Sequence, residues 1–349
     1  MKKGKTMDKI LSVIIPSYNS LPYLDKCLGS LVCEKDITDK LDVIVVNDGS
    51  TDGSEKICDK YINMYPDSFS LISKENGGHG SAINAGSAQA RGKYMKVLDA
   101  DDWFATENIP AFVEKLENTN ADVVLTCHHT IDISTGEIKN WRNFPDEYGK
   151  EYTLEEIMEN WKGFDRSLTF HGITYRTDFY KEKSIKLSEK VFYEDHEYAT
   201  YPCCFAKTIL PLDLFIYEYR IGDVSQSVSA ENQLKRIKHT FIVISRLMKE
   251  KTNVTEPWGA AYVDKKTHLL LLSYLVTTML CDPDRTRGCA RGIRMMDYVR
   301  RKNPAVYDMS INHFKILKLM NRMNISYEGY NRILRSGLYN KLRHNKSFD

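Results

Sequence analysis

Four short strand-like runs, separated by polar loops and three segments of helical periodicity, fill about the first 100 residues of the 349-residue chain. Continuous apolar runs of this length are typical of parallel strands buried on both faces. Parallel neighbours need a crossover connection, usually a helix, so the alternation predicts a doubly wound, mostly parallel α/β sheet. The predicted strands of this part are Leu11–Pro16, Leu41–Val46, Phe69–Ser73 and Lys93–Leu98. Further strands are predicted at Ala121–Asp132, within Phe170–Leu187 and at Ile209–Tyr219.

The polar loops after these strands are expected to lie together. In doubly wound sheets, ligands bind in a crevice at the carboxyl ends of the strands. We therefore expect one ligand site built from four loops. Their sequences are Pro16-Ser17-Tyr18-Asn19, Asn47-Asp48-Gly49-Ser50, Asn76-Gly77-Gly78-His79-Gly80-Ser81 and Asp99-Ala100-Asp101-Asp102.

The fourth loop holds three carboxylates. In an extended segment Asp99 and Asp101 point to the same side, because side chains alternate along a strand. Paired carboxylates repel each other unless a cation lies between them, and hard divalent ions take oxygen ligands and bridge carboxylates to phosphates. The loop therefore predicts a metal–diphosphate site. An acidic turn that caps a helix starting near Thr106 is the simpler alternative.

Several nucleotide-binding classes do not fit the motifs. Neither Gly-x-Gly-x-x-Gly nor Gly-Lys-Ser/Thr follows the first predicted strand, so neither a nicotinamide-binding domain nor a P-loop is predicted. Haloacid-dehalogenase phosphatases carry Asp-x-Asp on the first strand with Thr or Ser after it. Here it ends the fourth predicted strand and is followed by Asp-Trp.

Four motifs follow one another in a specific order: Ile14-Ile15-Pro16-Ser17-Tyr18-Asn19; Val45-Val46-Asn47-Asp48-Gly49-Ser50-Thr51-Asp52; Asn76-Gly77-Gly78 with Asn84-Ala85-Gly86; and Leu98-Asp99-Ala100-Asp101-Asp102. Together they resemble the family 2 glycosyltransferases of the GT-A fold over about the first 130 residues. The resemblance implies a nucleotide-diphospho-sugar donor, most often a UDP-sugar, and a Mn²⁺ or Mg²⁺ ion.

The resemblance also implies roles for single residues. Asp48 would accept a hydrogen bond from the uracil N–H, a strong charge-assisted contact. Glycines in the third motif would let the backbone pass close to ribose and phosphate. Asp101 would hold the metal, with Asp99 and Asp102 as the other candidate ligands. The implied donor-binding residues are Pro16, Ser17, Tyr18, Asn19, Asp48, Asn76, Gly77, Gly78, Asp99, Ala100 and Arg220.

A second acidic pair lies at the start of a later predicted helix. By the same resemblance Asp195 would be the catalytic base, with Glu194 as its support. The alternative is that both carboxylates only interact favourably with the helix dipole. Arg220 follows the last predicted strand, Ile209–Tyr219, and is implied to neutralise phosphate charge. The Ser-rich segment Gly222–Ser229 after it is implied to form a loop that closes over the diphosphate. The Gln-x-x-Arg-Trp motif of processive synthases is absent, so transfer of single sugars is expected.

The chain is expected to divide into a GT-A nucleotide-sugar-binding and catalytic domain, residues 1–230, and a helical C-terminal appendage, residues 231–349. Residues 285–349 contain 15 Lys and Arg against 4 Asp and Glu, whereas the whole chain has a net charge of only +2. Such a basic segment suits an acceptor, an anionic membrane surface or a second subunit in a homodimer. A solvated helical surface is an equal alternative. No nucleic-acid partner is expected.

Cysteine usage and hydropathy bear on location. The eight cysteines form no Cys-x-x-Cys pair, which predicts reduced thiols in a cytoplasmic protein. The longest apolar stretch, Leu269–Leu280, is shorter than the roughly 20 residues that span a bilayer. We therefore expect no transmembrane segment, and a cytoplasmic location that extends to the inner face of the plasma membrane if the basic tail binds lipid.

Three classes of function remain. The first is an inverting, metal-dependent glycosyltransferase that moves a single sugar to a hydroxyl group of a glycan or lipid-linked acceptor in cell-surface polysaccharide synthesis. The second is a non-catalytic binder of sugar nucleotides or carbohydrates, which would not need both Asp101 and Asp195. The third is a nucleotidyltransferase, which would carry a Gly-rich loop with Arg and Lys after the first strand. No motif identifies the donor sugar, the acceptor or the linkage.

Overall fold

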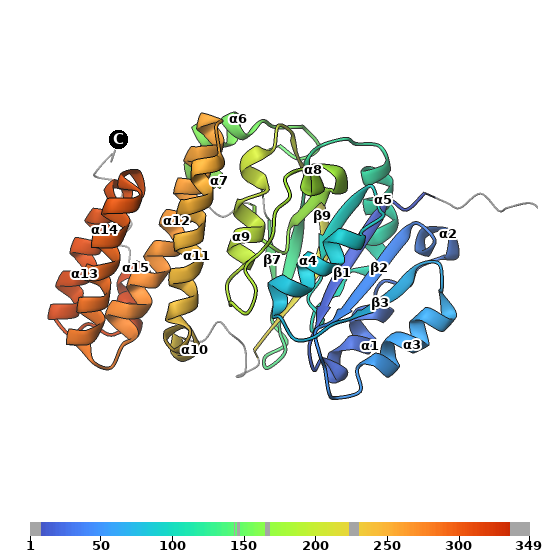
Figure 1. Cartoon of the computed structure of the whole chain (residues 1–349), viewed down its shortest axis with the longest axis horizontal. Helices are drawn as coiled ribbons and strands as arrows, with labels where there is room; N and C mark the ends of the chain where they lie inside the picture. Colours follow the sequence, from blue (N-terminus) through green and yellow to red (C-terminus); the bar gives the residue numbers. More distant parts are fainter. Residues whose placement is uncertain (1–7, 143, 145–146, 165–167, 223–229, 336–349) are drawn as a thin grey trace, which may run out of the picture. The chain divides into compact units, whose positions relative to one another are not determined.

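The computed structural model describes residues 8–142, 144, 147–164, 168–222 and 230–335 (Figure 1). The chain divides into two compact units. The first comprises Met1–Gln226 and Asn253–Tyr262, and the second comprises Ser227–Thr252 and Val263–Asp349. Residues 253–262, which the sequence assigns to the appendage, thus group with the first unit.

A nine-stranded mixed sheet forms the centre of the first unit. Its order is β3-β2-β1-β4-β8-β6-β9-β5, and β7 pairs with β6 outside this path. Strands β3, β2, β1 and β4 are parallel, whereas β8 is antiparallel to both of its neighbours. The strands are β1 (Leu11–Ser17), β2 (Leu41–Asn47), β3 (Phe69–Ser73), β4 (Tyr94–Val97), β5 (Trp103–Phe104), β6 (Val123–Asp132), β7 (Ile138–Trp141), β8 (Ile173–Arg176) and β9 (Ile209–Ile221).

Helices cover this sheet, and their presence together with a helical C-terminal region confirms the predicted fold class (Figure 1). One large hydrophobic core contains the apolar side chains of α1 and α5, the Tyr61 ring of α3 and strand residues such as Val13 and Tyr217. The helices are α1 (Leu21–Gly29), α2 (Lys35–Thr38), α3 (Glu55–Met64), α4 (His79–Gln89), α5 (Ile109–Glu117), α6 (Leu154–Glu159), α7 (Trp161–Phe164), α8 (Thr177–Glu182) and α9 (Asp195–Thr200), with 3₁₀ turns at Thr106–Asn108 and Cys203–Phe205.

The first two strands behave as their sequences predict. Every residue of β1 and β2 is buried, as expected for parallel strands covered on both faces. Helix α4 lies close against β1 at Gly86, where a Cβ atom would approach Ile14 Cγ2 to 2.5 Å. Glycine therefore permits the close packing that fixes the start of α4 beside the carboxyl ends of the strands.

Strands β5 and β7 are not predicted from the sequence. β5 has two residues and pairs with β9, and β7 is mostly exposed. Neither contains the continuous apolar run by which the other strands are recognised. The short β5 matters for the site, because it holds the far end of the acidic Asp99–Asp102 segment that leaves β4.

The second unit is helical. Its chain runs through α10 (Ala230–Lys235), α11 (Ile237–Glu250), the larger part of α12 (Pro257–Val276), a π-helical turn at Thr277–Cys281, α13 (Arg285–Lys302), α14 (Pro304–Arg322) and α15 (Tyr327–Arg335). Gly288 and Gly292 let α13 approach the π-helical turn, since a Cβ at Gly288 would lie 2.2 Å from the Thr278 carbonyl oxygen. No helix in the described residues combines the length and apolar character needed to cross a membrane.

Candidate functional site

The loops after β1 and β2 are joined by hydrogen bonds. Asn19, in a left-handed backbone conformation with φ of 50°, accepts a hydrogen bond from the Thr51 N–H through Oδ1 (2.9 Å). Its own N–H donates to Ser50 Oγ (3.0 Å). Pro16 and Ser17 are buried at the end of β1, whereas the Tyr18 side chain is 55% exposed. The two predicted donor loops thus form one surface with an accessible aromatic ring.

Asp48 holds the glycine loop that follows β3. Its buried carboxylate accepts hydrogen bonds from the Gly77 N–H at Oδ1 (2.9 Å) and the Gly78 N–H at Oδ2 (2.7 Å). Lys74 Nζ also donates to Oδ1 (2.7 Å), and Asn76 Nδ2 donates to the Asp48 carbonyl oxygen (2.9 Å). From the sequence, Asp48 is expected to contact a nucleobase. Its hydrogen bonds to the glycine loop are an additional role that the sequence does not predict.

The glycine loop and α4 in turn hold the segment that leads to Glu194. Gly78 has a φ of 87°, which favours glycine, and a Cβ there would lie 3.0 Å from the Lys190 nitrogen. The Lys190 N–H donates to the Gly77 carbonyl oxygen (2.7 Å). Asn84 of α4 exchanges two hydrogen bonds with the Leu187 backbone (2.9 and 3.0 Å). Residues far apart in sequence therefore form one packed layer.

The acidic segment forms a turn, so the prediction that Asp99 and Asp101 lie side by side on an extended strand is wrong. Strand β4 ends at Val97, and the Asp102 N–H donates to the Asp99 carbonyl oxygen (3.0 Å). The turn buries Ala100 and directs Asp102 into the protein, where its carboxylate accepts hydrogen bonds from the Tyr217 hydroxyl and the Arg220 N–H (2.7 Å each).

A candidate metal site arises from this turn. Oxygen atoms of Asp99 and Asp102 and a ring nitrogen of His171 lie within 4.8 Å of one another. His171 lies in the turn that leads into β8, and the sequence does not single it out. Buried Lys96 supports its backbone, donating to the carbonyl oxygens of His171 (2.7 Å) and Ile173 (3.1 Å). Asp101 is outside the cluster and lies 3.8 Å from a guanidinium nitrogen of Arg220.

The electrostatics of this cluster favour a bound cation. Burial raises the pKa of Asp102 well above its usual range, and repulsion from Asp99 and Asp101 adds to the increase. Burial, again with repulsion from Asp99, also raises the pKa of Asp101. Burial lowers the pKa of His171 to about 4, so its imidazole is neutral and can offer a lone pair. Two carboxylates and a neutral imidazole are a chemically suitable ligand set for a divalent metal.

His79 connects the acidic turn to the second acidic pair. Its Nε2 lies 2.9 Å from Asp99 Oδ1, and its Nδ1 lies 2.6 Å from Glu194 Oε1. Burial alone would lower the pKa of His79, but the two carboxylates together raise it well above its ordinary value. The sequence does not predict this role for His79, because Asp99 and Glu194 lie 20 and 115 positions away along the chain.

The members of the acidic pair at the start of α9 have different surroundings. Glu194 is buried and bound to His79, whereas Asp195 is half-buried, and its carboxylate has no hydrogen-bond or ion-pair partner among the described residues. Asp195 lies within electrostatic reach of His171 and Tyr219. The structure thus brings Asp195 near the acidic turn, as a base acting at that site requires. The Ser-rich loop expected after Arg220 falls mainly on residues 223–229, outside the described residues.

The mixed sheet and the loops at its carboxyl edge define the GT-A class of fold. Residues 12–181 match the model of the family described as "Glycosyl transferase family 2", so this segment is similar to that family. Among solved structures, the fold is similar to S. aureus TarS 1-349 in complex with UDP-GlcNAc. The TM-score is 0.63 at 21% identity, over 93% of this chain and 92% of that one.

Curated relatives share part of their length with this chain. Glycosyltransferase GlyG of Streptococcus pneumoniae serotype 4 is 31% identical over 158 residues, which are 45% of this chain and 52% of GlyG. The teichoic acid poly(glycerol phosphate) polymerase of Staphylococcus epidermidis is 30% identical over 182 residues, 52% of this chain and 24% of the polymerase. The chain spans from about a third to three fifths of the first three curated relatives it matches.

Proposed function

We propose that the chain is an inverting, metal-dependent glycosyltransferase. It would move a single sugar from a UDP-sugar to a hydroxyl group of a glycan or lipid-linked acceptor in cell-surface polysaccharide synthesis. One observation carries this proposal: the unpaired Asp195 carboxylate lies near the Asp99–Asp102–His171 cluster. The UDP-GlcNAc bound to TarS supports a UDP-sugar donor, and the name of the polymerase relative supports a surface polymer as product.

The proposed donor site uses the joined loops after β1 and β2. The exposed ring of Tyr18 is available to stack on a nucleobase. Asp48 Oδ2 accepts one protein hydrogen bond, so a lone pair remains for the ring N–H of uracil. Asn76, Gly77 and Gly78 would border ribose and phosphate, with Asp99 and Ala100 beside the ribose or the sugar. Pro16, Ser17 and Asn19 would complete the base pocket.

The residues fit a bound Mn²⁺ or Mg²⁺. We propose Asp99, Asp102 and His171 as ligands and keep Asp101, the ligand expected from sequence, as a further candidate beside them. Three carboxylates in one turn repel one another, and this repulsion favours a cation. When bound, the ion would offset the negative charge that develops on the departing diphosphate. Arg220, whose guanidinium lies near Asp101, would add a second positive charge there.

The proposed base is Asp195. Its carboxylate would accept the proton of the acceptor hydroxyl as the acceptor oxygen forms a bond to the anomeric carbon. The bond between that carbon and the diphosphate oxygen would break, and its electron pair would leave with the nucleoside diphosphate. One displacement from the opposite face inverts the anomeric configuration. His79 would hold Glu194 beside Asp195 and connect both to the donor side through Asp99.

We also propose a location and a role for the second part of the chain. All eight cysteines are free thiols, which fits a cytoplasmic protein, acting at the inner face of the plasma membrane. Residues 1–230 would form the catalytic domain. Residues 231–349 would contact the acceptor, the membrane surface or a second subunit of a homodimer.

A donor panel tests the proposal. UDP-, GDP- and TDP-sugars are incubated with the protein and Mn²⁺, and released nucleotide is measured with and without a chelator. We expect metal-dependent release from one UDP-sugar, and a strong loss in Asp101→Ala and Asp102→Ala. Asp178→Ala, an exposed carboxylate on α8, is the matched control and should keep activity. Donor binding without release or transfer would support a non-catalytic binder, and release of pyrophosphate from a nucleoside triphosphate would indicate a nucleotidyltransferase.

A further inference from the structure

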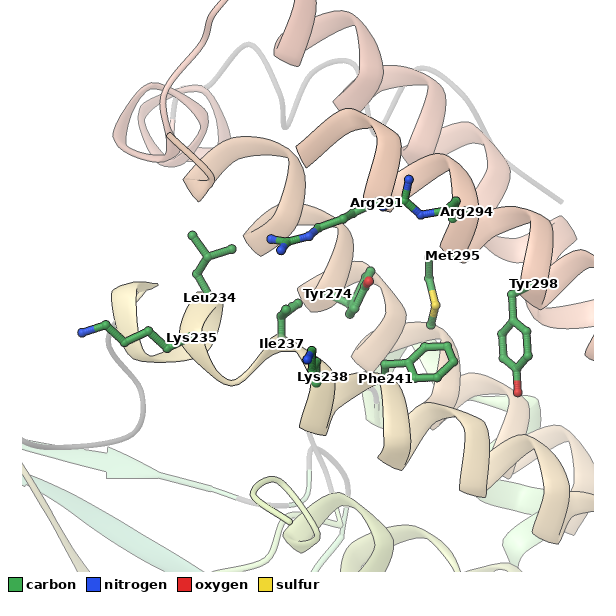
Figure 2. Close-up of a pocket in the computed structure, with 10 residues that line it drawn as sticks. All are labelled: Leu234, Lys235, Ile237, Lys238, Phe241, Tyr274, Arg291, Arg294, Met295 and Tyr298. Atoms are coloured by element: carbon green, nitrogen blue, oxygen red, sulfur yellow. The ribbon is translucent and has the colours of Figure 1, made fainter. Parts of the chain in front are cut away.

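The helical unit contains a cavity of its own. It has a volume of about 540 Å³ and is bounded by α10, α11, α12 and α13. Figure 2 shows Lys238 and Phe241 on the α11 side and Arg291, Arg294 and Tyr298 on the α13 side. The cavity is large enough for one or two sugar-sized groups, and each described residue that lines it belongs to the second unit.

The lining carries positive charge that protein carboxylates neutralise only in part. Among the residues that the structure describes, four basic side chains line the cavity and no acidic side chain does. Lys235 pairs with Glu231 (2.7 Å), and Arg291 pairs with buried Asp282 (3.0 Å). Lys238 and Arg294 have no carboxylate partner among residues 8–142, 144, 147–164, 168–222 and 230–335. Positive charges on two walls of one cavity repel each other, so an anion between them is stabilising.

The remaining lining is aromatic and apolar. Tyr274 is buried in the floor, and its hydroxyl lies within electrostatic reach of Arg291 and Arg294, which oppose the effect of burial on the pKa of that group. Phe241 and Tyr298 lie close together, with ring centroids 5.2 Å apart. Guanidinium, ammonium and phenol groups donate hydrogen bonds to phosphate oxygens, and aromatic rings pack against the C–H faces of sugars and polyols.

We propose that this cavity binds a phosphate-bearing glycan, a sugar or polyol chain with phosphate ester groups, between Lys238 and Arg294. Its identification as the acceptor rests on the proposed function, whereas its affinity for phosphate esters rests only on the cavity. Phosphate would lie between the two unpaired cations, and a neighbouring sugar or polyol unit would contact Phe241 and Tyr298. The helical unit thereby gains a defined ligand class.

Phosphate could also come from a lipid headgroup, but the shape of the site favours a chain that enters a cavity. A helix that binds a bilayer inserts protruding apolar side chains into the interface. Among the described residues of this unit, the most exposed large apolar side chains belong to Ile316 and Leu319 of α14 and to Met323 directly after it, and none of them lines the cavity. The basic cavity and this apolar stripe are separate features.

Direct binding to the full chain tests the inference. The probes are a short poly(glycerol phosphate), an uncharged dextran fragment of similar length, and phosphatidylcholine vesicles with and without phosphatidylglycerol. The variant Lys238→Gln/Arg294→Gln removes the two unpaired cations. Arg301→Gln/Lys302→Gln removes the same charge from exposed positions at the end of α13 and is the matched control. Circular dichroism confirms that both variants are folded.

We expect saturable binding of poly(glycerol phosphate) that weakens with salt, and no binding of dextran. Lys238→Gln/Arg294→Gln should weaken binding by about 100-fold, since each charge-assisted contact contributes about tenfold, whereas the control should change it less than about threefold. Equal losses in the two variants, no binding, or binding only to anionic vesicles would each overturn the inference. If the polymer binds as expected but the protein releases nucleotide from no donor, the cavity is confirmed as a phosphate-ester site. In that case the proposed function is wrong, and with it the identification of the bound glycan as the acceptor.

Discussion

His79 Nδ1 lies 2.6 Å from Glu194 Oε1, although 115 residues separate the two in sequence. The other ring nitrogen lies 2.9 Å from Asp99 Oδ1. One imidazole therefore connects the loop that carries the proposed base to the acidic turn at the end of β4. If these loops moved apart, the buried Glu194 carboxylate would lose its ionic partner His79, which is unfavourable for a buried charge. We conclude that His79 is a positioning residue, which fixes the Glu194–Asp195 segment relative to the acidic turn Asp99–Asp102.

His79→Ala tests this connection. Removing the imidazole leaves a buried carboxylate unpaired, which costs about 1–3 kcal/mol of stability and displaces the Glu194–Asp195 segment. We expect kcat to fall about 10- to 100-fold with less than a threefold change in donor KM. His79→Gln, which can still donate one hydrogen bond, should recover part of the rate. Equal losses in kcat and in donor affinity would mean that His79 contacts the donor directly.

Gly80→Ala probes the same packing from the backbone. A Cβ at Gly80 would lie 2.3 Å from the Ser188 carbonyl oxygen and 2.9 Å from Glu194 Cγ. Helix propensity alone predicts that alanine stabilises α4 by about 1 kcal/mol. We expect the opposite, a lower melting temperature and a lower kcat, because the loop before Asp195 must move. Gln89→Ala at the exposed end of α4 is the control, and a stabilised Gly80→Ala protein would contradict the proposed packing.

The sequence predicts the strands of the sheet better than it predicts the contacts of the site. β1, β2 and β3 lie within a residue of the predicted runs. β1 and β2 are recognisable because strands buried on both faces must be continuously apolar, and β3 lies at the edge of the sheet and is only partly buried. The order of strands and helices then indicates which edge gathers the loops. β5 and β7 could not be recognised, since one is too short and the other too exposed to show a pattern.

The contacts of His79 and His171 could not be predicted for a different reason. Both are single polar residues beside glycines and aromatics, and their partners are distant in sequence. Asp102 was one of three equivalent carboxylates until the turn distinguished them by burying it against Tyr217. Which carboxylate points inward depends on where β4 ends, and helix and strand patterns define ends to only a few residues.

His171→Ala tests the candidate metal site. If His171 supplies one of three protein ligands, its loss should raise the Mn²⁺ concentration needed for half-maximal nucleotide release by at least about tenfold, with little change at saturating metal. Mn²⁺ titration of activity and of tryptophan fluorescence measures this shift. His313→Ala, an exposed histidine on α14, is the control. An unchanged titration would remove His171 from the ligand set and favour Asp101.

Asp282 should make the helical unit sensitive to acid. Its buried carboxylate accepts hydrogen bonds from Arg287 (2.6 and 3.0 Å) and Arg291 (3.0 Å). The Arg287 hydrogen bond is the main reason that the pKa of Asp282 is below its ordinary value, despite burial. Because the folded state binds the proton less tightly than the unfolded state, this stabilisation is complete above the unfolded pKa, about 3.9, and is lost as pH falls through the folded pKa.

Thermal unfolding of the Asp282→Asn variant tests whether the Asp282 carboxylate stabilises the helical unit at neutral pH and loses this effect in acid. At neutral pH we expect a loss of about 3 kcal/mol, because two arginines lose a buried partner. Below pH 4 the difference between parent and variant should shrink, since the parent carboxylate becomes protonated. Helical circular dichroism follows the transition. A difference that stays constant from pH 7 to pH 3 would show that the charge of Asp282 does not stabilise this unit.

The most direct test of the account compares Asp195→Asn with the parent protein in sugar transfer and in donor binding. Asparagine keeps the size of the side chain but cannot accept the acceptor proton as a carboxylate does. We predict that the transfer rate falls at least about 100-fold, within the range for loss of general-base catalysis, while the dissociation constant of the UDP-sugar with Mn²⁺ changes less than about threefold. Transfer at the parent rate by Asp195→Asn would contradict Asp195 as the base and, with it, the proposed mechanism.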